Sequence, residues 1–377
     1  MSIVPRSPWI VALLAASACS PRSHETAADA GSAAPPPSAA PPASASAEPP
    51  SSAAAPPASA SAEPEGPPPL VCPKAMVAVE GRFCIDRWEA SLVDKKSKAQ
   101  ISPYYPPDRR LAAQIADTWE KERFTMGGEK AQHMAIPALP AWEREREPDP
   151  VAVSRPGVKP NGYLTQLIAA RACENAGKRL CAPSEWRTAC RGEKKRSYPY
   201  GDEYVHGACN IFRAVHPAAL LHDNASVGHL DPRLNMVTEK NGDPLLRGTG
   251  TTARCKSEWG DDVIWDMNGN IDEWVADEPD PAGEPGLGGG TEPAAPASGS
   301  ASSPPPPAST GRPKTIPPAQ QTGLFLGGFF SRSKKDGCAS TVSKHLKSYF
   351  DYSTGTRCCW SPDAPKAGML PAPSPAD

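Results

Sequence analysis

The sequence predicts an α+β domain with much irregular structure, preceded by a disordered N-terminal tether. Apolar residues that alternate on both sides of Gly81 predict a β-hairpin near the start of the folded part. Apolar residues at helical spacing follow over residues 163–176, and the stretch 209–260 resembles a long loop. Strands, helices and loops therefore alternate along one chain.

The first residues have the pattern of an export signal. Arg6 supplies a positive charge, and residues 9–18 are apolar or small. That run is shorter than the roughly 20 residues that cross a bilayer, so it fits a signal peptide. Small residues just before Cys19 resemble the bacterial lipoprotein box, which implies that residues 1–19 are a signal peptide with lipid attached to Cys19. The alternative is an ordinary signal peptide cleaved nearby, with Cys19 incidental. Ser20 after Cys19 favours the outer membrane.

Two segments have compositions that do not support a folded core. Residues 20–69 are almost entirely Ala, Pro, Ser and Glu, which predicts a disordered tether that holds a domain off a membrane. Residues 278–319 are rich in Pro, Ala, Gly and Ser, which predicts a disordered insertion within one domain spanning 72–360. A linker between two domains is the alternative, but residues 323–360 are too few to fold alone without staples. We expect residues 361–377 to be a disordered tail.

Charge and hydropathy limit the partners. The formal net charge is −2, so no bulk electrostatic attraction to nucleic acid is expected. No later stretch is long and apolar enough to cross a membrane, so the expected membrane contact is the lipid anchor.

Cysteine usage indicates an oxidising compartment. The chain has 11 cysteines, and removing Cys19 leaves 11 − 1 = 10, an even number. An even set in an exported chain predicts up to five disulfides. Zinc is the competing interpretation, but the chain has no Cys-x-x-Cys pair and its seven histidines show no ligand spacing. The ten are Cys72, Cys84, Cys173, Cys181, Cys190, Cys209, Cys255, Cys338, Cys358 and Cys359.

The predicted elements follow in chain order. The hairpin covers residues 76–91, and the pattern is then unclear from 94 to 161. The helix over 163–176 ends at Gly177, a good C-terminal cap. Ser184 is a plausible N-cap for a second helix that ends at Gly192, which would place Cys173 and Cys190 on consecutive helices. Residues 198–202 form a predicted turn.

Seven short motifs occur in an order that resembles the formylglycine-generating enzyme family, also called the sulfatase-modifying factor domain. They are the sequences at 176–180, 185–186, 189–192, 198–202, 266–274, 327–328 and 355–358. Each motif alone is weak, and the specificity lies in their order. The resemblance covers about residues 72–360 and implies a mixed fold related to C-type lectins.

The resemblance also implies calcium. Matching positions in the family bind this ion through the side chains of Asp266 and Glu273 and the carbonyls of Gly269 and Ile271. Such a density of oxygen donors suits Ca²⁺, which takes 6–8 oxygen ligands. A second family site begins at an Asn-Ile pair, which matches Asn210 and Ile211. The alternative is a buried turn whose polar groups satisfy one another.

The catalytic positions depart from the family pattern. The family's enzyme binds Cu(I) through two cysteines shortly after the Gly-Gly pair, as expected of soft thiolate ligands. In this chain those positions are Arg332 and Gly337, the second beside Cys338. We therefore expect no copper, and no catalytic residue is assigned. The scattered histidines likewise do not predict the iron site of some relatives.

The resemblance implies a disulfide pairing. Cys173 and Cys190 lie 190 − 173 = 17 residues apart, the family's own spacing, and each pairs there with the C-terminal segment. The implied pairs are Cys173–Cys358 and Cys190–Cys338, and the remaining cysteines suggest Cys72–Cys84, Cys181–Cys359 and Cys209–Cys255.

Three functions remain open. The favoured one is a non-catalytic lipoprotein of the cell envelope that binds calcium and a peptide, glycan or protein partner. The alternatives are an oxidase, either formylglycine-generating or related, and a purely structural, wall-associated lipoprotein. Fold analogy does not choose among them.

Overall fold

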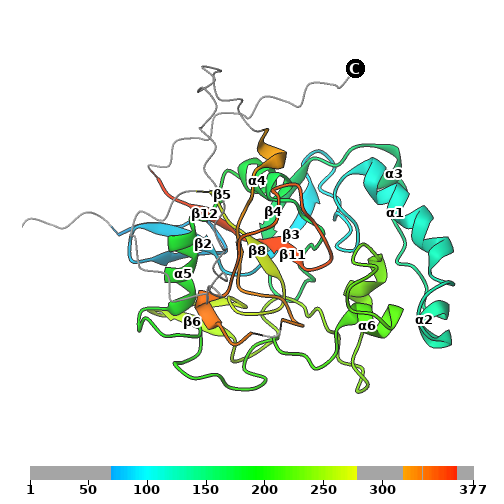
Figure 1. Cartoon of the computed structure of the whole chain (residues 1–377). Helices are drawn as coiled ribbons and strands as arrows, with labels where there is room; N and C mark the ends of the chain where they lie inside the picture. Colours follow the sequence, from blue (N-terminus) through cyan, green and yellow to red (C-terminus); the bar gives the residue numbers. More distant parts are fainter. Residues whose placement is uncertain (1–68, 278–316, 333, 363–377) are drawn as a thin grey trace, which may run out of the picture. The chain divides into compact units, whose positions relative to one another are not determined.

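The computed structural model describes residues 69–277, 317–332 and 334–362 (Figure 1). The predicted signal peptide with Cys19, nearly all of the tether, most of the insertion and most of the tail lie outside these residues. Within the described part, small sheets and short helices are joined by long loops. The α+β class with much irregular structure is thus confirmed.

The first sheet brings both ends of the domain together. Its strand order is β1-β2-β12-β5, formed by β1 (Met76–Val79), β2 (Phe83–Asp86), β12 (Cys358–Trp360) and β5 (Arg179–Leu180). The β1–β2 pair is the predicted hairpin. Strand β12 pairs antiparallel with both β2 and β5, so the C-terminal strand lies inside the sheet (Figure 1).

The second sheet also combines segments from both sides of residues 278–316. Its order is β10-β9-β8-β11, formed by β10 (Thr341–Val342), β9 (Phe325–Leu326), β8 (Asp272–Trp274) and β11 (Thr354–Thr356). Strand β8 pairs parallel with β11 and antiparallel with β9. Both sheets therefore need the chain before and after that segment.

The remaining strands form two separate two-stranded sheets. The first pairs β3 (Ala90–Asp94) with β4 (Pro150–Ser154), and the second pairs β6 (Lys256–Trp259) with β7 (Asp262–Trp265). Both are antiparallel.

The two predicted helices are present, one with a different start. Helix α4 (Gln166–Asn175) is capped by the Thr165 hydroxyl, which accepts from the Ile168 amide at 3.1 Å. Helix α5 (Pro183–Arg191) begins after Ala182, so the prediction of Ser184 as N-cap is wrong. Proline at the first helical position needs no N–H partner, and Glu185 accepts the Ala182 amide at 2.9 Å, so the helix starts earlier.

Several other elements were not predicted from the sequence. The unclear stretch contains α1 (Arg109–Glu122), α2 (Glu129–His133) and α3 (Ala141–Glu145). The predicted loop over 209–260 contains α6 (Pro217–His222), a 3-10 turn (Pro232–Met236) and strand β6, so that prediction is wrong in part. The short helices α2, α3 and α6 depend on tertiary contacts more than on local propensity.

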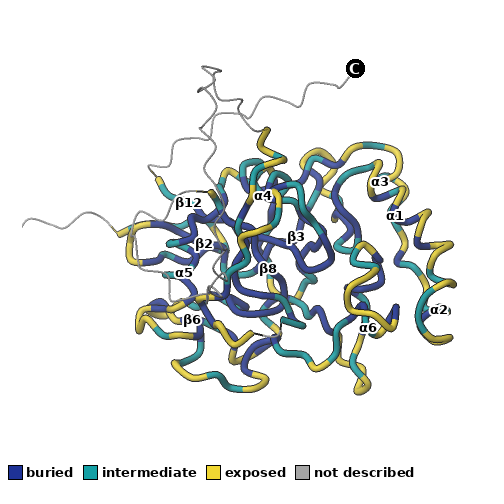
Figure 2. The backbone as a smooth tube through the Cα atoms, in the orientation of Figure 1, coloured by how far each residue is buried: buried dark blue, intermediate teal, exposed yellow. Residues whose placement is uncertain are grey.

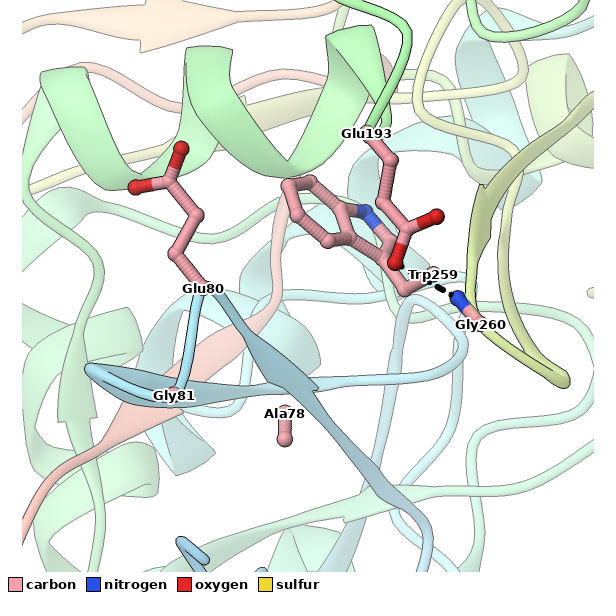
Figure 3. Close-up of a pocket in the computed structure, with 6 residues that line it drawn as sticks. All are labelled: Ala78, Glu80, Gly81, Glu193, Trp259 and Gly260. Carbon is pink, nitrogen blue, oxygen red and sulfur yellow. Dashed lines mark hydrogen bonds between the residues drawn. The ribbon is translucent and has the colours of Figure 1, made fainter. Parts of the chain in front are cut away.

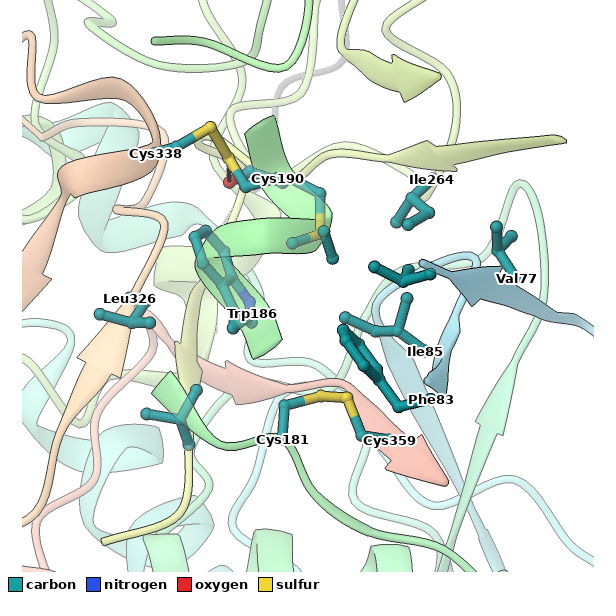
Figure 4. Close-up of a cluster of buried hydrophobic side chains, with 14 of the residues drawn as sticks. Val77, Phe83, Ile85, Cys181, Trp186, Cys190, Ile264, Leu326, Cys338 and Cys359 are labelled. Atoms are coloured by element: carbon teal, nitrogen blue, oxygen red, sulfur yellow. Dashed lines mark hydrogen bonds between the residues drawn. A yellow bond between two sulfur atoms is a disulfide. The ribbon is translucent and has the colours of Figure 1, made fainter. Parts of the chain in front are cut away.

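The core surrounds Trp186 of α5 (Figure 4). Apolar side chains from β1, β2, β7 and β9 pack here, and two disulfides border the cluster, Cys181–Cys359 and Cys190–Cys338. The burial map places the lowest exposure along the strands of both sheets (Figure 2). Trp186 itself is fully buried.

Five disulfides join the described segments. Two of them, Cys173–Cys358 and Cys190–Cys338, are the pairs that the resemblance implies. The other three, Cys72–Cys84, Cys181–Cys359 and Cys209–Cys255, are the pairs that the remaining cysteines suggest. Such bonds are typical of proteins that fold in an oxidising compartment. Among the described residues, no helix is long and apolar enough to cross a bilayer.

Candidate functional site

The Gly327–Gly328 pair after β9 makes a tight loop above Trp186. Both glycines are left-handed, with φ of +92° and +78°. A Cβ on Gly327 would lie 3.2 Å from Trp186 Cζ2, and one on Gly328 would lie 2.6 Å from Arg332 Cδ. Glycine is therefore needed here for both conformation and space.

Arg332, at the first of the two catalytic positions, lies beside a buried carboxyl. Its Nη1 is 3.9 Å from Asp272 Oδ1, and its Nη2 donates to the Thr341 carbonyl at 3.1 Å. Burial raises the pKa of Asp272 to about 8, and Arg332 opposes that rise. A guanidinium and a carboxyl thus lie where the family has a thiolate.

Gly337, at the second position, has no room for any side chain. It opens the 3-10 turn Gly337–Ala339 with φ of +54°, and a Cβ there would lie 2.3 Å from the Ser197 carbonyl oxygen. The neighbouring Cys338 is bonded to Cys190. All ten cysteines in the described part of the chain are in disulfides.

The turn before β8 carries the predicted calcium ligands. Asp266, with φ of +58°, accepts the Gly250 amide on Oδ2 at 2.6 Å. The carbonyls of Gly269 and Ile271 lie in the same turn, where Gly269 O accepts the Ile271 amide at 2.9 Å. Glu273, two residues further in β8, is almost fully buried.

Glu273 is held by an arginine and a tryptophan. Its Oε2 accepts from Trp186 Nε1 and from Arg357 Nε, both at 2.6 Å, and its Oε1 accepts from Arg357 Nη2 at 2.7 Å. This is a bidentate, charge-assisted pair, the strong form of such a contact.

Asn210 lies directly against the same turn. The Asn270 amide donates to the Asn210 carbonyl at 2.8 Å, and a Cβ on Gly269 would lie 2.4 Å from that oxygen. The Asn210 side chain donates to Leu245 O and Asn270 Oδ1, and its Oδ1 accepts from Arg213 Nε at 2.9 Å. Ile211 is buried beside the Cys209–Cys255 disulfide.

These contacts do not fit a calcium ion at the predicted ligands. The side-chain oxygens of Glu273 and Asn210 receive guanidinium hydrogens. Among the residues that the structure describes, no group of three or more His, Cys, Asp or Glu could hold a metal ion.

Sequence reasoning gave no role to two members of this network, Glu89 and Arg357, although the motif at 355–358 contains Arg357. Glu89 is fully buried, accepts from Asn270 Nδ2 at 2.7 Å on Oε2, and has no hydrogen-bond partner on Oε1. Burial, reinforced by Asp266 and Glu273, raises the pKa of Glu89 well above its ordinary value, and burial raises the pKa of Asp266 to about 7. The neighbouring Asp86 and Arg87 make Glu89 look like one more polar residue of a mixed stretch, so the sequence carried no signal for its burial.

A further buried carboxyl, Glu143 in α3, predicts a pH dependence of stability. Its Oε1 accepts the Ser102 amide at 2.9 Å, its Oε2 has no partner, and burial raises its pKa to about 7. The folded protein thus holds this proton more tightly than the unfolded chain, so the stability it adds is complete below about pH 4.5 and is lost as pH rises to about 7. Relative to wild type, Glu143→Gln should gain about 1.4 kcal/mol per pH unit across that window and then level off.

Urea unfolding at several pH values measures this difference. The control is Glu145→Gln, which changes an exposed carboxyl in the same helix and should follow the wild type. A Glu143→Gln profile parallel to the wild type at every pH would show that Glu143 keeps its charge in the folded state.

A surface hollow lies between the β1–β2 turn, the β6–β7 turn and the segment after α5 (Figure 3). Its volume is about 380 Å³, and its lining is Ala78, Glu80, Gly81, Glu193, Trp259 and Gly260. Glu193 accepts the Gly260 amide at 2.8 Å, and Glu80 pairs with Arg82 at 3.0 Å. A second hollow of about 250 Å³ shares Glu193 and Gly260 and adds Arg191, Lys194 and Arg196. Neither hollow is lined by a residue that was predicted from the sequence as a site residue.

Comparison with known proteins identifies a family. A family model described as the sulfatase-modifying factor enzyme 1-like domain matches residues 139–361. No curated protein is significantly similar in sequence to this chain.

Solved structures give weaker likenesses. A Major Tropism Determinant I1 variant matches with a TM-score of 0.33 and 11% identity over 77% of this chain and 53% of that one. The structure of CarF matches with a TM-score of 0.30 and 12% identity over 74% of this chain and 85% of that one. The chain thus spans about half the length of the Major Tropism Determinant, and scores this low support no argument about function.

Proposed function

Since the chain belongs to the sulfatase-modifying factor enzyme 1-like family, we propose that it is an exported binding domain without the copper-dependent oxidation chemistry of the family's enzyme. The observation that supports this is the state of the two catalytic positions. Arg332 lies beside Asp272 at the first, Gly337 has no room for a side chain at the second, and Cys338 is bonded to Cys190. Cu(I) selects soft thiolate ligands, and the described residues supply none.

The proposed location is the cell envelope. The domain, residues 72–360, would hang from a lipid on Cys19 through the tether 20–69, in the outer membrane. Five disulfides support an oxidising compartment. Mass spectrometry of the mature N-terminus tests the anchor, and an unmodified Cys19 would contradict it.

The proposed ligand is a peptide, glycan or protein partner. Ligand sites are usually concave, with a few convergent polar groups around an apolar or aromatic floor. The hollow lined by Trp259, Glu80 and Glu193 is the candidate place for this ligand, since it offers an aromatic ring with carboxylates on either side (Figure 3). Calcium is not part of this proposal, because the side-chain oxygens of Glu273 and Asn210 accept guanidinium hydrogens.

Copper and peptide assays test the non-catalytic part of the proposal. We expect no stoichiometric Cu(I) binding against a competing chelator, and no oxidation of a cysteine-containing sulfatase-type peptide. Thiol titration of the denatured, unreduced domain is the matching control, and it should find no free thiol among the ten paired cysteines. The proposal would be overturned if one copper bound per chain and if two free thiols were found by alkylation of the unreduced domain.

The second candidate is an oxidase, formylglycine-generating or related. Family membership is the observation that favours it. Turnover of the peptide would support this candidate whether or not copper is bound. The peptide assay thus separates the two functions directly.

A further inference from the structure

We infer that the guanidinium groups of Arg357 and Arg213 supply the positive charge at the two places where the resemblance implies calcium, so that this domain stays folded without a divalent cation. The inference rests on the contacts of two arginines and is independent of any ligand or activity.

Arg357 satisfies the carboxylate that a calcium ion would need. Glu273 Oε2 accepts two short hydrogen bonds, from Arg357 Nε and Trp186 Nε1, which use both of its lone pairs. The second oxygen accepts from Arg357 Nη2. Calcium requires direct oxygen contacts at roughly 2.3–2.6 Å, so it would have to displace donors already in place.

Arg357 is built into the core as a permanent structural group. Its side chain is fully buried, and its remaining donors reach the Asp86 carbonyl at 3.1 Å and the Trp265 carbonyl at 2.9 Å. It thereby ties β2, β7 and β8 together from its place between β11 and β12. A dication bound to Glu273 would lie close to this fixed charge in a poorly screening interior, where like charges repel strongly.

Arg213 acts in the same way at the second place. Its Nε donates a hydrogen bond to Asn210 Oδ1 at 2.9 Å. Its Nη1 lies 3.1 Å from both carboxylate oxygens of Glu239. The backbone of Arg213 is fixed as well, because its amide donates to Phe330 O at 2.9 Å.

Two further oxygen donors, Asp223 and Asn224, follow Asn210 in the sequence. Asp223 is an exposed left-handed residue at the end of α6, and Asn224 Oδ1 accepts the Ser226 amide at 2.8 Å. The carboxylate at this place, Glu239, is already paired with the guanidinium of Arg213.

The first test uses the wild-type protein. We expect no heat of calcium binding by titration calorimetry, and a melting temperature that is the same in excess chelator and in millimolar Ca²⁺. A rise in melting temperature with Ca²⁺, or a binding heat with a stoichiometry near one, would overturn the inference.

The second test removes the guanidinium. Arg357→Met leaves Glu273 buried beside Glu89 and Asp266 without its cation, so the melting temperature should fall by roughly 10 °C. Millimolar Ca²⁺ should then restore part of that loss, and Mg²⁺ less, because Mg²⁺ dehydrates reluctantly and needs stricter geometry. A variant that folds and gains nothing from Ca²⁺ would contradict the role of Arg357 as a substitute cation.

Two further variants complete the design. Arg144→Met removes a guanidinium from an exposed pair with Asp117, and should change neither the melting temperature nor its response to Ca²⁺. If Arg357→Met does not fold, Arg213→Gln allows the same comparison of melting temperatures with and without Ca²⁺, at a side chain that is partly exposed. The chelator result on the wild-type protein still decides the inference.

Discussion

A single cut within residues 278–316 is expected to leave the two halves of the domain joined and folded. Three disulfides cross this segment, Cys173–Cys358, Cys181–Cys359 and Cys190–Cys338. Strand β12 lies between β2 and β5, and β11 pairs with β8, so both sheets also hold the two halves together. Covalent bonds and sheet pairing therefore replace the missing peptide bond.

A protease recognition sequence inserted after Gly290 makes this measurable. On a denaturing gel the cut protein should run as one band without reductant and as two bands with it. Its melting temperature before reduction should stay close to that of the uncut protein. Two bands without reductant would show that the three bridges do not form.

Reduction should have a much larger effect on the cut form than on the uncut one. On the chain-entropy model, a bridge such as Cys173–Cys358, with a sequence separation of 185, stabilises by about 5 kcal/mol. Once the bridges are reduced, the cut protein also loses the connection that keeps its halves at high local concentration. The uncut, reduced protein is the control, and it should retain more native structure at the same temperature.

The elements that could be predicted from the sequence are those whose residues show a clear local pattern of apolar spacing and glycines. Alternation around Gly81 predicted the β1–β2 hairpin, and apolar spacing with a terminal glycine predicted α4. Helix α1 carried a usable signal, because Ala112, Ile115, Ala116 and Trp119 recur at helical spacing after Asp108, and it was overlooked. The short helix α6 and the 3-10 turn after it offered no such pattern.

The candidate site could be only half predicted, for a physical reason. The motifs located the turn with Asp266 and Glu273 and the loop at Gly327, since these depend on glycines and carboxyls close in sequence. Which cation neutralises Glu273 depends on a partner 357 − 273 = 84 residues away. A carboxyl in a turn looks the same in sequence whether a metal ion or a buried arginine faces it.

The largest loss of stability from a single substitution is expected at Trp186. This side chain is fully buried in the core cluster, its Nε1 donates to Glu273 at 2.6 Å, and its ring lies under the Gly327 loop. Trp186→Ala removes the ring and opens a cavity, which typically costs about 3–5 kcal/mol. It also removes a donor from a buried carboxylate, which adds about 1–3 kcal/mol.

Trp186→Phe separates these two effects. Phenylalanine lacks the N–H and is smaller than the indole, whose Cζ2 and Cη2 face Gly327, so it keeps only part of the ring packing and should lose less stability than Trp186→Ala. Chemical denaturation of both variants beside the wild type measures the difference. Equal losses for the two variants would mean that the hydrogen bond to Glu273 outweighs core packing. A near-wild-type Trp186→Phe would mean that Arg357 alone satisfies the carboxylate, and that the tryptophan mainly supports the loop that positions Arg332.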